Sequence, residues 1–360
     1  MTKLLKYEQS RRAFLGSLAS VAAISAVPFT RGAFAETGKP LLVNSIRSLS
    51  NPYHAAWNAG GKAFAKSVGL DYVTLVTEGD SEKGVADIRG ILARTGGNAV
   101  VNVDPNDAAD ARPIAEACVE AGAHVFTQWN KPDDLHPWDL GPNYVAHMSY
   151  NGTDYGRLTA LEVIRVMGGK GGILALGGTL SNTVAIQRRA GLEMAIEASP
   201  DVELLDFQVA DWQASKAYDI VNTWLTRFAG QFQGIWCAND DMAIGALEAL
   251  RVNGLGGRIA ISGIDGIETA VQGVVDGELA ATVSWDPFWQ GSYGLAVPLL
   301  ARMGKLDVAS LGKEKREYYA KGKLVDSSNA KEFFDNNFAS EPSLDVDDIW
   351  ARYDSGIPQS

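Results

Sequence analysis

The chain has 360 residues, 46% of them hydrophobic, so it can bury a substantial core, and its size favours two domains over one. The formal net charge of −11 argues against nonspecific binding to nucleic acid or to an anionic membrane, because both need a basic surface.

The first 35 residues have the three parts of an export signal. Four basic residues open the chain: Lys3, Lys6, Arg11 and Arg12. An apolar stretch follows at 13–29, and Ala33-Phe34-Ala35 has the small-x-small pattern of a signal-peptidase site. The stretch is too short and too rich in Gly and Ser for a membrane span, which needs roughly 20 apolar residues. The paired arginines favour a twin-arginine signal at 1–35, with an ordinary secretory signal as the alternative. We therefore expect a soluble periplasmic protein.

After the signal, short apolar runs alternate with amphipathic segments. In the first block we predict strands at 41–45, 72–76, 99–103 and 124–127, and helices at 53–67, 82–94 and 108–121. In the second block we predict helices at 151–167, 183–198, 215–228, 240–252 and 267–276, and strands at 172–176, 202–209, 234–238, 259–264 and 280–284. Strands separated by such helices are typical of parallel, doubly wound sheets. The pattern predicts an α/β fold in two lobes, with the seam near Tyr150.

In doubly wound sheets ligands bind beyond the carboxyl ends of the strands, so the residues after each predicted strand are candidate binding residues. In the first block these are Arg47, Asn51, Tyr53, His54, Asp104, Trp129 and Asn130. In the second block they are Arg188, Trp212, Asn239, Asp265 and Trp285.

This mixture of side chains suits a sugar. Asp, Asn and Arg can each bind a pair of hydroxyls, and the C–H faces of a sugar pack on Trp or Tyr rings. Each candidate residue taken alone has a simpler structural explanation. Asn239 could cap the next helix, and a lone Trp is usually in the core. The whole set at successive strand ends favours a binding site.

Three motifs carry a family resemblance: residues 237–247 (CANDDMAIGAL), Ser50-Asn51-Pro52-Tyr53 and Gly263-Ile264-Asp265-Gly266. With residues 273–282, which are similar to the family's approach to a hinge, they make the chain resemble the periplasmic ribose-binding protein family over roughly 39–325. These are the type I sugar-binding proteins of ABC importers. By position, the resemblance implies ligand contacts at all of the candidate residues except Arg47.

The chain departs from the ribose-binding pattern at four places. It has Trp129-Asn130 where ribose binders have an aspartate–arginine pair, and Trp285 where they have a glutamine. His54 stands at a phenylalanine position and Arg47 at a serine position. Because the site loses a charged pair and gains indole surface, we expect a hexose, deoxysugar or polyol in place of ribose.

The resemblance also implies a periplasmic binding protein type I fold, with lobes that close about a hinge of three crossings. We expect the crossings near Tyr150-Asn151, near Ser284-Trp285, and between Lys313 and Tyr319. The N-terminal lobe would then comprise 36–150 and 285–315, and the C-terminal lobe 151–284 and 316–335. Residues 336–360 would form an extension.

Other classes of function find little support. The sequence has no nucleophile elbow, no phosphate-binding glycine loop and no dinucleotide fingerprint, and its four histidines lack metal spacing. We therefore expect no catalytic residue, no cofactor and no metal. A repressor would need a DNA-binding domain where the export signal lies.

The expected partners are a sugar or polyol and an ABC permease in the inner membrane, with the protein acting as a monomer that captures its ligand by hinge closure. The alternative is a sugar sensor that presents its ligand to a chemoreceptor or histidine kinase.

Overall fold

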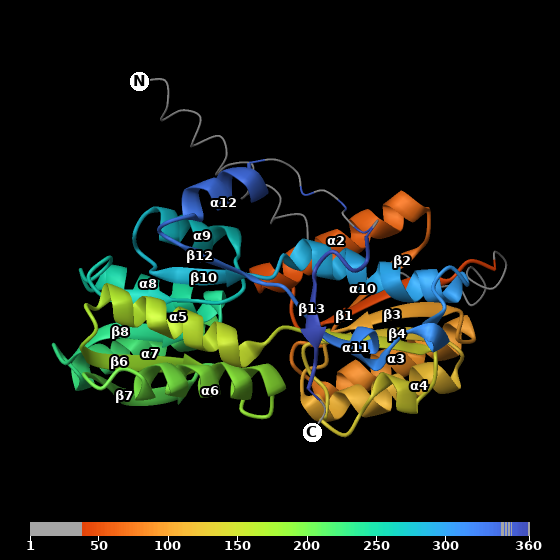
Figure 1. Ribbon diagram of the computed structural model, residues 1–360, viewed down its shortest axis with the longest axis horizontal. Helices are drawn as coiled ribbons and strands as arrows, with labels where there is room; N and C mark the ends of the chain where they lie inside the picture. The colour runs from red at the N-terminus through yellow and green to blue at the C-terminus, as the bar shows by residue number, and fades with distance from the viewer. Residues whose placement is uncertain (1–37, 340–341, 343, 345, 347, 359–360) are drawn as a thin grey trace, which may run out of the picture. The chain divides into compact units, whose positions relative to one another are not determined.

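The computed structural model describes residues 38–339, 342, 344, 346 and 348–358. These residues form two α/β lobes, each built on a mostly parallel sheet that is flanked by helices (Figure 1). The predicted export signal lies outside the described residues. Within the described part of the chain, no helix combines the length and the apolar character that a membrane crossing requires.

The first lobe contains a sheet of seven described strands in the order β13-β11-β5-β4-β3-β1-β2. The strands are β1 (Leu41–Ile46), β2 (Tyr72–Val76), β3 (Ala99–Val103), β4 (His124–Gln128), β5 (Tyr144–Ser149), β11 (Glu317–Ala320) and β13 (Tyr353–Gly356). The helices are α2 (Pro52–Val68), α3 (Ser81–Thr95), α4 (Ala111–Glu120), α10 (Pro287–Arg302) and α11 (Lys313–Arg316), with short 3-10 turns η1 (Ala108–Asp110), η2 (Pro137–Asp139) and η3 (Val308–Ser310). Helix α10 packs against α2 and over β3 and β4, and α3 packs against α4.

The second lobe contains a sheet of six described strands in the order β12-β10-β9-β8-β6-β7. The strands are β6 (Gly171–Gly177), β7 (Val202–Val209), β8 (Phe232–Cys237), β9 (Ala260–Ser262), β10 (Ala281–Ser284) and β12 (Lys323–Asp326). The helices are α5 (Gly152–Val166), α6 (Thr183–Glu197), α7 (Ala214–Arg227), α8 (Asp240–Val252), α9 (Glu268–Val275) and α12 (Ala330–Asn337). Helix α5 packs on α6, α7 on α8, and α12 on α9.

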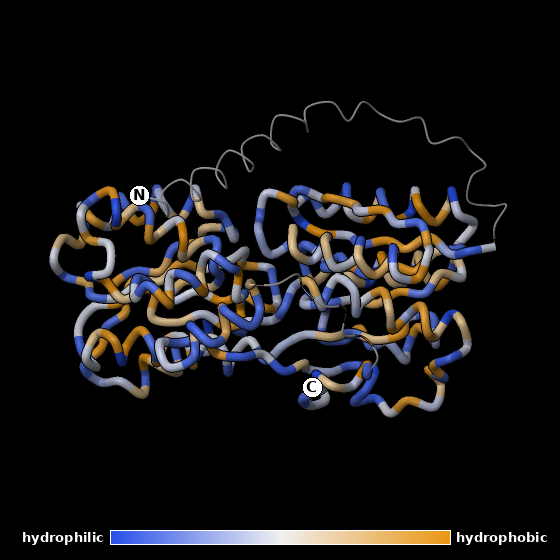
Figure 2. The backbone as a smooth tube through the Cα atoms, turned by 90° about the horizontal axis from the view of Figure 1, so that it is seen from above, coloured by the Kyte–Doolittle hydropathy of each residue, from blue (hydrophilic) through white to orange (hydrophobic). Residues whose placement is uncertain are grey.

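The apolar strands are buried because helices cover both faces of each sheet. Strands β1 and β3 are buried at every position, as expected for parallel strands with continuous apolar runs. Hydrophobic stretches recur through both lobes in Figure 2, separated by hydrophilic segments. The carboxyl ends of these buried strands carry the polar residues that form the site described below.

The chain passes between the sheets at four places in the described structure. It leaves the first sheet after β5, returns between β10 and α10, and leaves again between β11 and β12. After α12 it comes back to the first sheet as β13, which pairs antiparallel with β11. Arg352, just before β13, bonds to Asp286 at the start of α10 over 2.7 Å, so the C-terminal segment is anchored beside a crossing.

The structure corrects the sequence-based assignment of the last 45 residues. Residues 316–335 were expected in the second lobe, but residues 317–320 form β11, which pairs with β5 in the first sheet. The third crossing therefore lies at Lys321 and Gly322, and not between Lys313 and Tyr319. Residues 336–360 are not a simple extension, because α12 runs to Asn337 and β13 is a strand of the first sheet. These pairings join residues far apart in the chain, which local patterns do not reveal.

Candidate functional site

A cavity of about 60 Å³ lies between the two lobes, beyond the carboxyl ends of the strands. Eleven of the twelve residues predicted from the sequence line it, and the exception is Trp285. The lining residues are Arg47, Asn51, Tyr53, His54, Asp104, Trp129, Asn130, Asn182, Val184, Arg188, Trp212, Asn239 and Asp265. Asn182 and Val184 were not predicted, although they follow β6 much as the predicted residues follow other strands.

Three of the lining asparagines are helix N-caps. Asn51 accepts a hydrogen bond from the Tyr53 N–H, Asn182 from Ala185, and Asn239 from Met242. Helices α2, α6 and α8 therefore begin beside the cavity, with the positive ends of their dipoles near it. Asn239 can therefore both cap α8 and line the cavity. The two roles are compatible because a helix that follows a parallel strand starts at the strand's carboxyl end.

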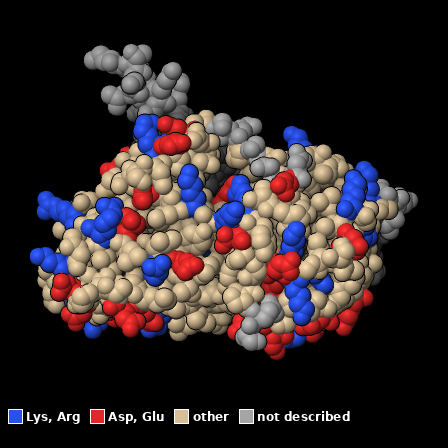
Figure 3. All heavy atoms as spheres, in the orientation of Figure 1, with Lys and Arg blue, Asp and Glu red and all other residues tan. Residues whose placement is uncertain are grey.

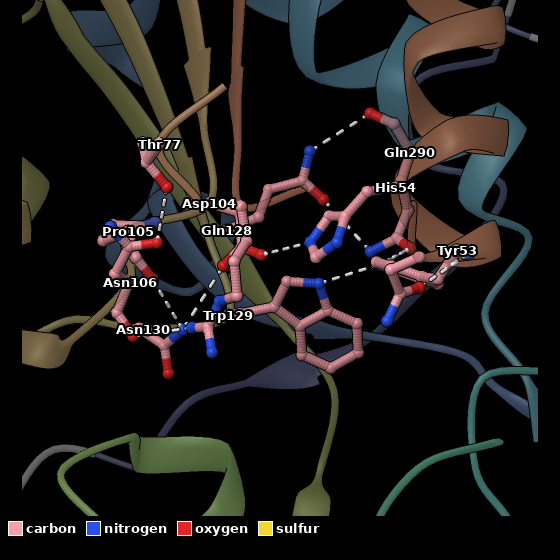
Figure 4. A network of polar contacts seen from close by, with 12 residues as sticks. Tyr53, His54, Thr77, Asp104, Pro105, Asn106, Gln128, Trp129, Asn130 and Gln290 are labelled. Atoms are coloured by element: carbon pink, nitrogen blue, oxygen red, sulfur yellow. Dashed lines mark hydrogen bonds and ion pairs between the residues drawn. The ribbon is translucent and has the colours of Figure 1, made fainter. Parts of the chain in front are cut away.

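The first lobe holds its polar side chains in a connected network (Figure 4). His54 Nε2 lies 3.1 Å from Asp104 Oδ2, and Asn130 Nδ2 donates to Asp104 Oδ1 over 3.3 Å. Asn130 also donates to the Pro105 carbonyl over 3.0 Å. His54, Asp104 and Asn130 are all less than a tenth exposed, so these bonds fix their orientation toward the cavity.

A second set of bonds orients the aromatic rings of this lobe. Trp129 Nε1 donates to the Tyr53 hydroxyl over 2.8 Å, and that hydroxyl donates to Gln290 Oε1. Gln290 Nε2 in turn donates to Gln128 Oε1 over 3.1 Å, and Gln128 Nε2 donates to Asn102 Oδ1 over 2.9 Å. Gln290, Gln128 and Asn102 are fully buried. Sequence reasoning did not single them out as residues that position Tyr53 and Trp129, because nothing local marks a buried amide chain that spans two strands and a helix.

The second lobe contributes a buried ion pair, Arg188 with Asp265. Arg188 Nη1 lies 3.8 Å from Asp265 Oδ1 and donates to the Ala238 carbonyl over 2.6 Å. Burial raises the pKa of Asp265 well above its usual range, while the Arg188 guanidinium opposes that shift. Burial likewise lowers the pKa of Arg188, and Asp265 opposes it. The two charges offset each other at the edge of the cavity.

Arg188 also lies against three indole rings. Its Cζ is 5.3 Å from the ring centroid of Trp129, 5.6 Å from that of Trp212 and 5.7 Å from that of Trp285. At these distances the guanidinium makes cation–π interactions with the rings, and such interactions stabilise a buried positive charge. The arginine of the second lobe thus contacts a tryptophan of the first lobe across the cavity.

Trp285 differs from the expectation that it lines the site. It is only 1% exposed and packs against Tyr150 at 4.3 Å, Tyr155 at 4.8 Å and Trp129 at 5.5 Å between ring centroids. Because these rings lie near the crossing after β10, Trp285 belongs to the packed core at this crossing. Its position immediately after a strand end places Trp285 near the cavity, as the sequence predicted. Its indole ring, however, packs in the core and does not line the cavity.

Hydrogen bonds join the lobes along one rim of the cavity. Ser181 Oγ donates to Asp107 Oδ1 over 2.5 Å, Asn182 Nδ2 to the Asn106 carbonyl over 3.3 Å, and Thr183 Oγ1 to the Lys131 carbonyl over 3.3 Å. The loop after β6 is therefore docked on the first lobe. The two lobes are therefore in direct contact along this rim.

The charges at the cavity balance. Two arginines (Arg47 and Arg188) and two aspartates (Asp104 and Asp265) line it. Outside the cavity, acidic and basic side chains are interspersed on the face of the molecule that Figure 3 shows. The lining therefore favours a neutral polar molecule over a strongly charged one.

Several buried polar atoms at the cavity have no hydrogen-bond partner among the described residues. They are His54 Nδ1, Asn130 Oδ1, Arg188 Nε and Trp212 Nε1. A buried polar atom without a partner costs about 1–3 kcal/mol, so these atoms are suited to hydrogen bonds with a ligand.

The described residues contain no group of three or more His, Cys, Asp or Glu side chains that could hold a metal ion. Cys118 and Cys237 are both free and buried. The arrangement offers hydrogen bonds, balanced charge and a cavity between two lobes, and these features suit a solute-binding protein.

Comparison with known proteins gives the family. Residues 42–305 match the model of the periplasmic binding protein domain, and the chain belongs to that family. The resemblance to ribose-binding-protein-like sugar-binding proteins is confirmed, as is the fold. Members are solute-binding proteins and not enzymes, so this chain is a solute-binding protein of the sugar-binding ABC transporter class.

Three similar proteins show the range of the family. The chain is 28% identical to a putative rhizopine-binding protein of Rhizobium meliloti, over 87% of this chain and 97% of that protein. It is 36% identical to a xylitol-binding protein of Mycolicibacterium smegmatis, over 36% of this chain and 37% of that protein. A crystal structure of a twin-arginine translocation pathway signal protein from Burkholderia phytofirmans shares 52% identity, covers 89% of this chain and 99% of its own, and superposes with a TM-score of 0.87.

Proposed function

We propose that this protein captures a neutral sugar or sugar alcohol in the periplasm and delivers it to an ABC permease. The observation that carries the proposal is the cavity between the lobes, whose charged residues balance and whose unpartnered polar atoms come from both lobes. A hydroxyl both donates and accepts, so a polyhydroxylated molecule can satisfy all four of these atoms. The names of the rhizopine-binding and xylitol-binding relatives support this class of ligand.

Capture would occur by closure of the hinge. Ligand contacts are divided between the lobes, with His54 and Asn130 in the first and Arg188 and Trp212 in the second. A ligand that bonds to both sides binds the closed form better than the open form, and so shifts the population toward closure. The permease would then recognise the closed form.

We further propose that the twin-arginine route exports the protein and that cleavage follows Ala35. The arginine pair Arg11-Arg12 and the small-x-small site support this, as does the similarity to a twin-arginine pathway signal protein. A folded protein would then reach the periplasm, where an importer's binding protein acts.

The test is calorimetry of the mature protein with neutral sugars and polyols, at low and at high salt, combined with small-angle scattering. We expect tight binding of at least one neutral compound, little salt dependence because no ion pair forms with the ligand, and a smaller radius of gyration on binding. The proposal would be overturned if none of the neutral sugars and polyols bound, or if the affinity fell steeply with salt. An unchanged radius of gyration would overturn hinge closure.

A further inference from the structure

Arg352 joins the C-terminal segment to two of the places where the chain passes between the sheets. Its guanidinium donates to Asp286 Oδ2 over 2.7 Å, at the crossing between β10 and α10. Its carbonyl accepts from the Lys321 N–H over 2.8 Å, at the crossing between β11 and β12. The Arg352 Cζ also lies 4.4 Å from the ring centroid of Trp289 in the first turn of α10. One residue near the C-terminus therefore holds together two crossings that are far apart in the chain.

The crossing after β5 is bonded to the same group. The Tyr150 hydroxyl donates over 3.0 Å to the carbonyl of Trp285, the residue directly before Asp286, and both of these rings are buried. On the side of the second lobe, the crossings after β10 and β11 are also joined, because Ser284 pairs with Lys323 in the sheet. Arg352 supplies the corresponding link on the side of the first lobe.

Asp286 has a backbone conformation that depends on its neighbours. Its φ of 53° and ψ of 75° lie in the left-handed region, which residues with a Cβ atom seldom adopt. Both carboxylate oxygens are bonded: Oδ1 accepts from the Trp289 N–H over 3.0 Å as the N-cap of α10, and Oδ2 accepts from Arg352. A strained conformation persists where the surrounding contacts hold it in place. Without the Arg352 guanidinium, Asp286 could relax and change the angle at which the chain leaves β10.

The crossing between β11 and β12 is held from both lobes at adjacent residues. The hydroxyl of Tyr155, in α5 of the second lobe, accepts from the Gly322 N–H over 2.9 Å and donates to the Gly322 carbonyl over 3.1 Å. Lys321 is bonded to Arg352, which precedes a strand of the first sheet. Rotation of the lobes would therefore be concentrated between Lys321 and Gly322, with Arg352 fixing the end of this pivot that belongs to the first lobe.

We propose that Arg352 is a positioning residue of the hinge, which limits how far the lobes separate and thereby sets the affinity for every solute. Arg352 is not among the residues that line the cavity. A solute that contacts both lobes binds only when the lobes are close together, so a wider range of open arrangements lowers the fraction of protein that can bind. The affinity for all solutes then falls by the same factor. This role does not depend on which solute binds.

The separation of the lobes can be measured in the protein without ligand. Spin labels are placed on Glu82→Cys at the start of α3 in the first lobe and on Ser215→Cys at the start of α7 in the second, and both positions are exposed. The native Cys118 and Cys237 are buried, which directs the labels to the introduced sites. In pulsed EPR, Arg352→Ala should shift the distances between the labels to longer values and broaden their distribution. Arg352→Lys keeps a positive charge beside Asp286 and should restore most of the wild-type distribution.

Arg112→Ala is the matched control. Arg112, in α4 of the first lobe, pairs with Asp134 at the surface over 2.9 Å, and its side chain is 38% exposed, compared with 31% for Arg352. This variant should leave the label distances unchanged. Calorimetry without labels then compares xylitol, D-ribose, D-allose and myo-inositol. Each compound that binds the wild type should bind Arg352→Ala more weakly by the same factor, about 3- to 10-fold.

A double-mutant cycle separates this role from general destabilisation. Asp286→Asn removes the ion pair with Arg352, but asparagine still caps a helix and tolerates the left-handed region. Its effect on the label distances should not add to that of Arg352→Ala, because both changes remove the same contact. A lowered melting temperature with wild-type distances would overturn the role and leave Arg352 as a stabilising residue only. Affinities that change by different factors for different solutes would also overturn it. If none of the four compounds binds, the proposed sugar-binding function is in question, while the label distances still decide the role of Arg352.

Discussion

Arg188 Nη1 lies 3.8 Å from Asp265 Oδ1, and the two side chains are only 4% and 8% exposed. Each therefore neutralises a charge that would be costly to bury alone. The pair also links two strand ends, because Arg188 is on α6 after β6 and Asp265 follows β9. Through its contact with Trp129, Arg188 extends this link across the cavity to the first lobe.

Asp265→Ala should weaken binding of the ligand found by the screen at least about 100-fold. Hydrogen bonds to a charged group contribute roughly 1.5–3 kcal/mol each, and 1.4 kcal/mol corresponds to a tenfold change in affinity. Calorimetry measures the effect, and Asp276→Ala, an exposed site in the same lobe, is the control. If Asp265→Ala binds as tightly as the wild type, the cavity is not the binding site.

Ser181→Ala should weaken binding of every ligand by a similar factor, about 3- to 10-fold. The Ser181 hydroxyl donates to Asp107 across the lobes and does not line the cavity. Its loss should therefore disfavour the closed form without changing selectivity. The control is Ser199→Ala, whose hydroxyl bonds within its own lobe to Ala195. A variant that alters the order of ligand affinities would contradict a role limited to closure.

The stability of the protein should depend on pH through Asp240. Burial raises the pKa of Asp240 from 3.8 to about 7, against opposing hydrogen bonds from Thr282 and Ile267. Because the folded state holds this proton to higher pH than the unfolded state, the contribution of Asp240 is fully present below about pH 4 and is lost as the pH rises through about 7.

We therefore expect Asp240→Asn to lose less stability than the wild type between pH 5 and pH 8, as measured by melting temperature. The amide stays neutral throughout this range and can still accept from the Ile267 N–H. Asp276→Asn, at an exposed position, should follow the wild-type curve. Parallel curves for Asp240→Asn and wild type would show that Asp240 is ionised in the folded state across the range.

Glu317→Ala should lower the free energy of unfolding by about 3–5 kcal/mol, because it leaves a buried charge without its partner. Glu317 is 2% exposed at its side chain, and it pairs with Lys131 at 2.8 Å and with His136 at 2.8 Å. Urea unfolding measures the loss. The exposed Glu332→Ala is the control, and Lys131→Met combined with Glu317→Gln should be less destabilised than Glu317→Ala. A change below about 1 kcal/mol for Glu317→Ala would contradict this role.

Arg11→Lys combined with Arg12→Lys should strand the precursor in the cytoplasm. The change keeps the charge of the signal but removes the arginine pair on which the twin-arginine route depends. Fractionation measures the outcome, with Lys3→Arg plus Lys6→Arg as an equally conservative control. Normal delivery of the arginine-to-lysine double variant to the periplasm would rule out this route.

The sequence determined the lobes and most of the candidate site. Helix 240–252 and strands 99–103 and 202–209 were predicted with the bounds that the structure has, because their apolar periodicity is local and strong. The polar residues after the strands were expected to meet because parallel strands end at the same edge of a sheet, and eleven of the twelve line one cavity. Strand β5 was missed, since the residues before Tyr150 were taken only as a seam.

Only the tertiary structure decided the remaining features. The pairing of Tyr318 with Met148 and with Gly356 joins distant parts of the chain, and β13 has no apolar pattern that would mark it. The direction in which the Trp285 indole turns and the position of Arg188 against the tryptophans depend on how the two lobes pack. So does the volume of the cavity, because contacts such as Ser181 with Asp107 set the distance between the lobes, and no local pattern in a sequence encodes that distance.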